Sequence, residues 1–415
     1  MIIVRTHILG SNSRVSLLVS AISHFLFPFL MPKLIRITTV PMALKYLLAG
    51  QMRYMKMNGF DVIMVSADGK EREDLIAQEG CPHQVIPMTR KITPYADIRS
   101  LWKLYRYFKK EKPDIVHSHT PKAGILAMLA ARMAGIKIRI HTIAGLRFVT
   151  SSGMVRTILV RAEKLTTKWA THVWPNSQSI LDYVKEHKLA DRQKLALIGY
   201  GSSNGVNLGR FSPQALQSRK LEATKQRLQY DEKLTYLLTV GRVVKDKGID
   251  ELLQAFQRVY SERSDLRLIL IGFFEDDLDP VSDEARKTLN EHPAIIHINW
   301  SDEVEYFMHL ANMLVHPSYR EGFSNVLLQA GAMHCPILCS RIEGNVDIVD
   351  DGHTGIIFDV KDAASLEQML RMALNHPTRL KTYADNLRRK IEQRFDQRFV
   401  QESLKTKYFQ LLSVQ

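Results

Sequence analysis

A turn that runs into an expected helix, SYREGFSNVLLQAG (318–331), carries side chains suited to binding a sugar and a phosphate. Glu321, Asn325 and Gln329 recur every four residues, so their side chains line one helix face. Gly322 lets the backbone approach a ligand closely, and Ser324 is a residue type that caps helix N-termini. Backbone N–H groups at such a terminus attract anions. The stretch predicts a polar binding site, with an ordinary capped surface helix as the alternative.

Two cations mark a second candidate site in VGRVVKDKGID (240–250). Arg242 follows an expected strand, and Lys247 lies just before a helix that begins at Gly248. Both charges and the helix start therefore face the same crevice. This combination favours binding of a phosphate or diphosphate. Two solvated surface cations beside a turn are the alternative.

The histidines of DIVHSH (114–119) form a third candidate group. Because side chains alternate along a strand, His117 and His119 lie on the same side. Such pairs occur in metallohydrolases, but those sites need further ligands, and His141 alone does not supply them. We therefore expect no metal site. Lys122 begins the next expected helix, where a lysine and a helix start suit a phosphate of the acceptor.

These candidates lie between short apolar runs and amphipathic helices that alternate from Met31 onward. Such alternation predicts parallel sheets with helices on both faces. Strands are expected at 34–39, 61–67, 84–88, 114–119, 137–143, 172–177, 195–199, 234–243, 266–273, 311–318, 335–340 and 354–359. Helices are expected near 42–58, 97–111, 122–134, 153–169, 178–186 and 248–262, with a closing helix at 395–412.

A loop rich in glycine, serine and asparagine, GYGSSNGVNLGRFSP (199–213), interrupts this alternation. It predicts two doubly wound α/β domains, residues 31–212 and 213–394. The segment 395–415 is expected to be a helix that packs back towards the first domain. Ligands of such sheets bind at the carboxyl ends of the strands, so two substrates are expected in a cleft between the domains.

Residues 1–30 do not share this pattern. Their most apolar stretch, 15–31, is short for a membrane span and contains serines, a histidine and a proline. At Met31 the sequence takes the form of a natural start, with a charged lead-in and an immediate buried strand. We expect residues 1–30 to be an extension from a misassigned start codon or a loose helix. A signal sequence and an interfacial membrane anchor are the alternatives.

Taken in order, the motifs resemble the retaining family-4 glycosyltransferases of the GT-B fold, over nearly all of residues 31–412. The resemblance rests on HSHTPKAG (117–124), YGSSNGVNLGRF (200–211), VGRVVKDKG (240–248), SYREGFSNVLLQAGA (318–332) and GNVDIVDDGHTGIIF (344–358). Each motif is weak alone, but the ordered set is specific. It is most similar to bacterial enzymes that build O-antigen, capsule or other surface polysaccharide. The donor is then expected to be a nucleoside-diphosphate sugar, with a UDP-sugar foremost.

The resemblance implies a role for each candidate residue. Two are expected to be catalytic: His119, which matches a histidine that lies against the sugar, and Glu321, which matches the first of two paired glutamates. The residues that match donor contacts are Arg242, Lys247, Gly322, Phe323, Asn325, Val326 and Gln329. The cations and the helix start would stabilise the leaving diphosphate, so no metal and no other cofactor is expected. Gly50 and Lys122 are the residues expected on the acceptor side.

One position departs from the family pattern. Gln329 occurs where the family usually has its second glutamate, which holds the nucleotide ribose. An amide still hydrogen-bonds ribose hydroxyls, so we expect altered nucleotide affinity and retained chemistry. The departure leaves open a catalytically inactive scaffold that binds nucleotide sugar. A GT-B-fold epimerase is a further alternative, although the sequence does not identify the acid and base carboxylates that it needs.

The net charge of +14 is unevenly distributed. Residues 31–210 hold 29 lysines and arginines against 13 acidic residues, whereas residues 211–415 hold 26 against 30. Nucleic acid would suit the basic half, but no nucleic-acid motif is present, so we expect no such partner. The helix 96–112 is basic and is expected to bury Ile98, Leu101, Tyr105 and Phe108 and to leave Trp102 and Tyr107 exposed or at the edge.

Basic amphipathic helices with edge aromatics bind anionic bilayers, and a surface helix of a soluble domain is the alternative. We expect peripheral contact with the inner face of the cytoplasmic membrane and a lipid-linked or saccharide acceptor. The three cysteines are too few for a disulfide framework and fit the cytoplasm. Cys335 and Cys339 are expected to be core thiols rather than a metal pair.

Overall fold

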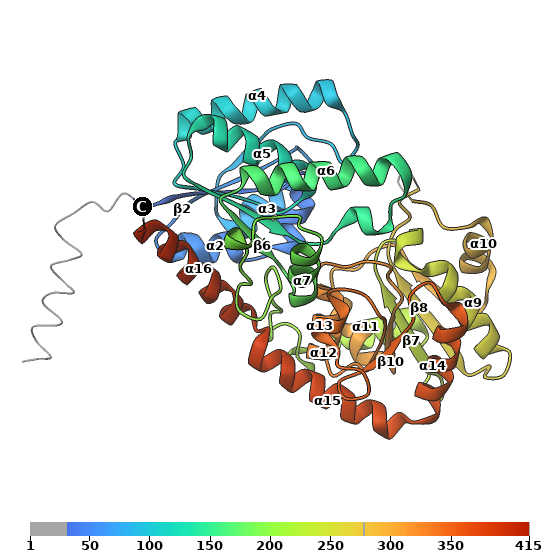
Figure 1. Ribbon diagram of the computed structural model, residues 1–415. Helices are drawn as coiled ribbons and strands as arrows, with labels where there is room; N and C mark the ends of the chain where they lie inside the picture. The colour runs from blue at the N-terminus through green and yellow to red at the C-terminus, as the bar shows by residue number, and fades with distance from the viewer. Residues whose placement is uncertain (1–30, 277–278, 415) are drawn as a thin grey trace, which may run out of the picture.

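The computed structural model describes residues 31–276 and 279–414, so the predictions for residues 1–30 lie outside the described residues. Two six-stranded sheets, each with helices on both faces, dominate the described chain (Figure 1). Every strand pairing in both sheets is parallel. The predicted fold class, two doubly wound parallel sheets, is therefore confirmed.

The first sheet has the order β3-β2-β1-β4-β5-β6. Its strands are β1 (Lys33–Ile37), β2 (Asp61–Ser66), β3 (His83–Val85), β4 (Ile115–Ser118), β5 (Ile138–Ile143) and β6 (His172–Pro175). The main helices around it are α2 (Gln51–Met57), α3 (Arg72–Glu79), α4 (Pro94–Glu111), α5 (Pro121–Ala134), α6 (Gly153–Trp169) and α7 (Gln178–Glu186). The strand order reverses between β1 and β4, and such a reversal opens a crevice at the carboxyl ends of these strands.

The second sheet has the order β12-β11-β10-β7-β8-β9. Its strands are β7 (Thr235–Val240), β8 (Leu266–Ile271), β9 (Ile295–Ile298), β10 (Met313–His316), β11 (Ile337–Ser340) and β12 (Ile356–Phe358). Its helices are α8 (Ser218–Leu228), α9 (Ile249–Tyr260), α10 (Asp283–Glu291), α11 (Val304–Leu310), α12 (Asn325–Ala332), α13 (Asn345–Ile348), α14 (Ala363–Asn375) and α15 (Pro377–Arg394). Here the order reverses between β7 and β10.

Burial on both faces explains why the strands are apolar along their whole length. The residues of β8, LRLILI, are all buried except Arg267, as expected for a strand covered by helices on both sides. The α9 helix places Ile249, Leu252, Phe256 and Val259 against this sheet, at the spacing of one helix face. The same periodicities made these elements predictable.

Two predicted elements need correction, and one strand was missed. The strand expected at 195–199 is reduced to one bridge, between Val173 and Leu195, because the chain turns away at Gly199 with a positive φ of 56°. The helix expected at 42–58 is interrupted before Gly50, which has a φ of 77° and begins α2. The short edge strand β9 was not predicted, since its half-buried residues lack a continuous apolar run.

The predicted buried face of 96–112 was also partly wrong. The buried residues of α4 are Ser100, Leu104 and Phe108, spaced four apart and facing the rest of the domain. Ile98 is 58% exposed, contrary to the prediction, whereas Trp102 is 51% exposed, as predicted. Leu101 and Tyr105 are half-buried and pack against the core of the first domain. The first half of the helix therefore shows apolar side chains to the solvent.

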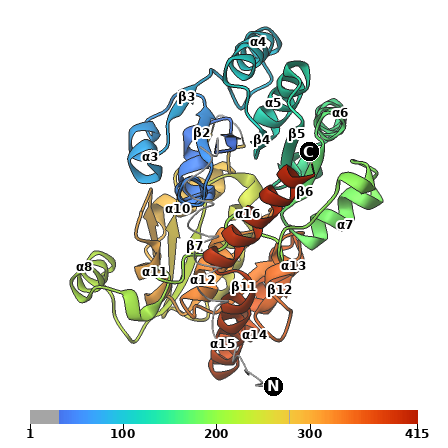
Figure 2. The same cartoon turned by 90° about the vertical axis from the view of Figure 1, so that its left-hand side faces the viewer.

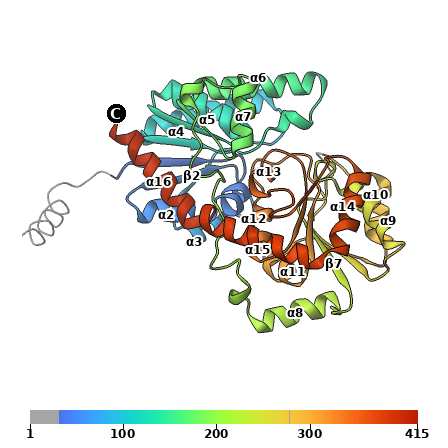
Figure 3. The ribbon, with the colours of Figure 1, turned by 60° about the horizontal axis from the view of Figure 1, so that its bottom comes forward.

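The last helix, α16 (Gln397–Ser413), joins the two halves of the molecule. It follows α15 in one continuous line from the second domain to the first (Figures 2 and 3). Tyr408 and Leu404 enter the core of the first domain beside Trp174. Cys335 and Cys339 are buried in the second domain, as expected for core thiols. Within residues 31–276 and 279–414, no helix combines the length and the apolar composition needed to cross a bilayer.

Candidate active site

Glu321 lies at the centre of a polar cluster beyond the carboxyl ends of β7 and β10. Its Oε1 atom contacts Lys247 Nζ and lies 3.1 Å from His316 Nε2. Only 17% of the Glu321 side chain and 20% of the Lys247 side chain are exposed. The structure thus brings together the two motifs that the sequence analysis singled out separately. His316 was missed, although its place at the end of an apolar strand gave a signal.

The electrostatics of this cluster keep Glu321 ionised. Burial alone would raise the pKa of Glu321, but the charge of Lys247 and the hydrogen bond from His316 hold it well below its usual range. An ionised carboxylate only accepts hydrogen bonds. Glu321 can therefore hold sugar hydroxyls and a cation, whereas it has no proton to give at neutral pH.

A glycine makes the position of Lys247 possible. Lys247 ends a 3-10 turn (Lys245–Lys247), and Gly248, with a φ of 66°, then begins α9. A Cβ atom on Gly248 would overlap the carbonyl oxygen of Pro317, one residue beyond β10. Only glycine lets the two strand ends approach this closely, which is why the lysine reaches Glu321.

The start of α12 borders the same cluster. Ser324 caps this helix, as predicted, by accepting from the backbone N–H of Leu327. Asn325 and Gln329 are half-buried on one helix face, and neither side-chain amide has a hydrogen-bond partner among the described residues. These two amides remain available to a ligand. Val326 packs against the core of the second domain.

Arg242 takes part in a contact that the sequence analysis did not foresee. Its guanidinium pairs with Glu275, which also pairs with Arg90 of the first domain at 2.5 Å. Glu275 follows β8, the neighbour of β7, so the sheet order brings it beside Arg242. A carboxylate here competes with a diphosphate for the same cation.

The donor motif lies where the backbones of the two domains meet. A Cβ atom on Gly322 would overlap the carbonyl oxygen of Ala144, in the loop after β5. Nearby, Arg320 Nε donates to Thr150 Oγ1 of the first domain at 2.9 Å and to Asp246 at 2.8 Å. Phe323 is buried against Phe395, with ring centroids 5.1 Å apart. The contacts with Ala144 and Thr150 hold residues 320–322 against the first domain, whereas Phe323 packs into the core of the second.

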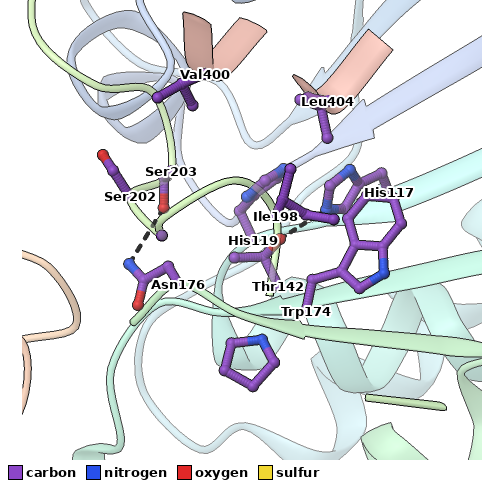
Figure 4. Close-up of a pocket in the computed structure, with 12 residues that line it drawn as sticks. His117, His119, Thr142, Trp174, Asn176, Ile198, Ser202, Ser203, Val400 and Leu404 are labelled. Carbon is purple, nitrogen blue, oxygen red and sulfur yellow. Dashed lines mark hydrogen bonds between the residues drawn. The ribbon is translucent and has the colours of Figure 1, made fainter. Parts of the chain in front are cut away.

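His119 lies in the first domain, in a cavity between the strand ends, the loop 198–203 and α16 (Figure 4). His117 and His119 are both buried, and their ring centroids are 4.2 Å apart, so the prediction that they share one side of β4 is confirmed. Burial and neighbouring positive groups hold the pKa of both rings well below the ordinary value. Gly201 links this cavity to the donor motif, since a Cβ atom there would lie 3.3 Å from Phe323.

The residues expected on the acceptor side have partners within the first domain. Lys122 Nζ pairs with Asp97 of α4, and the backbone N–H of Gly50 donates to Glu79 at 2.5 Å. His141, weighed as a metal ligand, is 2.8 Å from Ser118 Oγ. In the part of the chain that the structure describes, no three histidine, cysteine or carboxylate side chains are grouped as a metal site requires.

The comparisons with known proteins agree with this geometry. Residues 47–201 match the model of the Glycosyl transferase 4-like domain, and residues 221–394 match Glycosyl transferases group 1. The chain is 33% identical over 377 residues to the capsular polysaccharide biosynthesis glycosyltransferase CapM of Staphylococcus aureus, covering 91% of this chain and 96% of that protein. The chain belongs to the family-4 glycosyltransferases of the GT-B fold.

Other relatives of this glycosyltransferase are more distant. It is 25% identical to an Escherichia coli enzyme, UDP-Gal:alpha-D-GlcNAc-diphosphoundecaprenol alpha-1,3-galactosyltransferase, over 81% of this chain and 86% of that one. Among solved structures, Anabaena Alr3699/HepE in complex with UDP and glucose matches with a TM-score of 0.76 at 14% identity, covering 91% of this chain and all of that one. WaaG, a glycosyltransferase involved in lipopolysaccharide biosynthesis, matches with a TM-score of 0.69 at 17% identity, covering 90% and 98%. These two likenesses establish the fold alone.

Proposed function

We propose that this glycosyltransferase transfers a sugar from a UDP-sugar to a lipid-linked acceptor, with retention of configuration, during synthesis of a surface polysaccharide. The contact of Lys247 with Glu321 carries the proposal, because it places a phosphate-binding cation beside a sugar-binding carboxylate. The printed names of the Staphylococcus aureus and Escherichia coli relatives support the polysaccharide and the lipid diphosphate acceptor. The UDP complex of the Anabaena protein supports the nucleotide.

The chemistry follows from where charge develops. When the bond between the anomeric carbon and the diphosphate oxygen breaks, its electron pair leaves with UDP. Arg242, Lys247 and the N–H groups at the start of α12 then stabilise the negative charge, so no metal ion is needed. Glu321 accepts hydrogen bonds from the hydroxyls of the donor sugar. The acceptor oxygen attacks from the face that the diphosphate leaves, and its proton passes to the departing phosphate oxygen.

We also propose that the first domain rests on an anionic bilayer. Exposed apolar side chains occur on the first halves of both α4 and α6, and these helices lie on the same side of the first sheet (Figure 1). Tyr95 is 82% exposed and Met154 is 80% exposed. Further exposed apolar residues there are Ile92, Ile98, Trp102, Val155 and Ile158, and the cations on the same helices are Arg99, Lys103, Arg106, Lys109, Lys110, Arg156, Arg161, Lys164 and Lys168. Apolar side chains flanked by cations suit anionic lipids.

Release of UDP tests the catalytic proposal. The full chain is mixed with membrane lipid extract and a panel of uridine, guanosine and adenosine diphosphate sugars. One UDP-sugar is expected to be turned over, and Glu321→Ala and Lys247→Ala are expected to abolish release. Lys245→Ala, on the exposed side of the same turn, is the matched control and is expected to match the wild type. Turnover of a non-uridine donor contradicts the nucleotide assignment, and bound nucleotide without turnover would instead support the scaffold.

Flotation with vesicles tests the membrane proposal. The full chain is expected to float with vesicles that contain phosphatidylglycerol and to remain in solution with pure phosphatidylcholine. Replacing Tyr95, Ile98 and Trp102 together by serine is expected to abolish flotation. Serine at Phe399, an exposed aromatic on α16 (41%), is the control and is expected to change nothing. Failure of the wild type to float with anionic vesicles would contradict the proposal.

A further inference from the structure

A buried arginine lies directly behind His119. Arg36 belongs to β1, among the apolar residues Leu34, Ile35 and Ile37, and is fully buried. Its guanidinium contacts Gln51 Oε1, His119 Nε2 at 2.6 Å and Tyr408 OH at 3.0 Å. Within the described residues, no carboxylate lies at ion-pair distance from it. A guanidinium carries donors only, so each of these contacts has a fixed direction.

This direction determines the tautomer of His119. Because Arg36 donates to Nε2, that nitrogen must hold a lone pair. A neutral imidazole then carries its single proton on Nδ1. His119 Nδ1 is buried and has no partner within residues 31–276 and 279–414, while the ring lines the cavity. His119 therefore has one unused N–H donor beside the space where a ligand can lie.

A second chain of hydrogen bonds leads from Arg36 to the same cavity. Tyr408 OH accepts from Arg36, and we assign its own hydrogen to His117 Nδ1, 2.5 Å away, because no other acceptor contacts this hydroxyl among the described residues. His117 is then protonated on Nε2 and donates to Thr142 Oγ1 at 2.7 Å. The hydroxyl hydrogen of Thr142 remains free, and Thr142 also lines the cavity. Two adjacent histidines thus hold opposite tautomers, and both chains of hydrogen bonds end in a donor. Figure 4 shows the last contact of the second chain, between His117 and Thr142.

We propose that Arg36 is a positioning residue that fixes His119 as an Nδ1–H donor to an oxygen of the bound sugar, and that Tyr408 fixes the tautomer of the neighbouring His117. The inference rests on the proposed function, because it requires a donor sugar bound beside the cavity that His119 lines. In this role His119 acts neither as a general base nor as a general acid, since its proton stays on Nδ1. Tyr408 belongs to α16, so the last helix of the chain contributes a residue to this hydrogen-bond network.

The surroundings of His119 favour the neutral ring. Burial, Arg36 on β1 and His141 on β5 all oppose a positive charge on His119 and lower its pKa. Glu163 of α6 faces His141, 3.6 Å away, and Glu79 is engaged by the backbone N–H groups of Gly50 and Arg53. A carboxylate that would stabilise an imidazolium therefore does not reach His119 among the described residues.

Nitrogen NMR of the full chain labelled with ¹⁵N-histidine tests the tautomers. His119→Asn and His117→Asn assign the two signals. We expect His119 to be neutral with its proton on Nδ1 from pH 6 to pH 8, and His117 to be neutral with its proton on Nε2. Tyr408→Phe keeps the aromatic ring and is expected to release the tautomer of His117 while leaving that of His119 unchanged. A proton on Nε2 of His119, or an imidazolium at pH 7, would overturn the inference.

Activity supplies an independent readout. An asparagine amide N–H takes the place of Nδ1–H, whereas a glutamine amide reaches the place of Nε2. We expect His119→Asn to keep about tenfold more kcat/KM than His119→Gln, as loss of one neutral hydrogen bond predicts. Equal losses, or a better glutamine variant, would overturn the inference. Absence of turnover in the wild type would instead count against the proposed function, so the two failures are distinguishable.

Discussion

The donor cluster of the second domain (Lys247, His316 and Glu321) and the buried cluster of the first (Arg36, His117, His119 and Tyr408) both contain a cation. In the donor cluster, the cation contacts a carboxylate and is partly exposed. In the buried cluster, it contacts only neutral acceptors and is fully buried. The charge of Lys247 is suited to binding a charged ligand. The charge of Arg36 instead fixes the direction of hydrogen bonds between neutral groups.

The largest expected effect comes from neutralising the carboxylate of the donor cluster. Glu321→Gln leaves Lys247 beside an amide and weakens the contact with the sugar, so kcat/KM is expected to fall by about 100- to 1000-fold. Steady-state UDP release measures it. Glu343→Gln, in a nearby loop but with no partner in the cluster, is the control and is expected to stay near the wild type. A Glu321→Gln enzyme within fivefold of the wild type would show that the cluster is not the donor site.

A smaller loss of activity is expected from separating the two domains at their junction. Gly322→Ala places a Cβ atom against the carbonyl oxygen of Ala144, so residues 320–323 must move. A displacement of about 1 Å costs on the order of 100-fold in rate. Gly209→Ala, where the nearest atom is the side chain of Asn207 at 3.2 Å, is the matched control. Equal activities of both variants would contradict a tight junction.

How well each cluster could be predicted depends on how its residues are connected. Asn325 and Gln329 lie one turn apart on α12, so their spacing alone predicted a common face, whereas Glu321 precedes the helix. Arg36 and Tyr408 are 372 positions apart, and Arg36 was visible only as a charged residue in an apolar strand. Tyr408 resembles any core residue of an amphipathic helix. Its role depends on how α16 crosses between the domains.

Similar reasoning explains the errors in the fold. Apolar periodicity predicted the buried strands, but not the short edge strand β9, whose residues are half-buried. In α4, Ile98 looked like a core residue by type. The helix instead packs through Ser100, Leu104 and Phe108. Its exposed apolar side chains can therefore contact a surface outside the protein, such as the bilayer proposed above. Local patterns give the element, whereas its rotation depends on neighbours far away in sequence.

The pH dependence of stability reports on the donor cluster. There the ionised form of Glu321 is expected to add about 1 kcal/mol to the free energy of unfolding. Burial alone would raise the pKa of Glu321, but Lys247 and His316 lower it below its usual range. The ionised carboxylate therefore stabilises the fold fully above the ordinary glutamate pKa of about 4.3 and loses this contribution as the pH falls further. Urea unfolding of the wild type and Glu321→Gln is expected to show a constant difference from pH 5 to 7 that shrinks below about pH 4. A difference that grows on acidification would contradict the lowered pKa.

A modest gain is expected from removing the competitor of the diphosphate. Glu275→Gln frees Arg242 from its ion pair, so UDP affinity is expected to rise about threefold, a typical value for a partly exposed pair. Calorimetric titration with UDP measures it. Asp276→Asn, which removes the exposed partner of Arg286, is the control. Weaker binding in Glu275→Gln would mean that the carboxylate organises the site instead of competing with the ligand.

The smallest effect is expected at the position that departs from the family. Gln329→Glu adds a carboxylate on the exposed side of α12, and UDP affinity is expected to rise about twofold through the ribose hydroxyls. Competition with a fluorescent uridine nucleotide resolves a change of this size. A loss of affinity would show that the amide is matched to its surroundings.

The contrast between the clusters is tested most directly by titrating UDP into the full-length wild type, Lys247→Ala and Tyr408→Phe. If one cluster binds charge and the other orients a neutral donor, Lys247→Ala weakens UDP binding by at least about tenfold, whereas Tyr408→Phe stays within about twofold of the wild type. Equal weakening in both variants, or unchanged binding in Lys247→Ala, would contradict this division of roles.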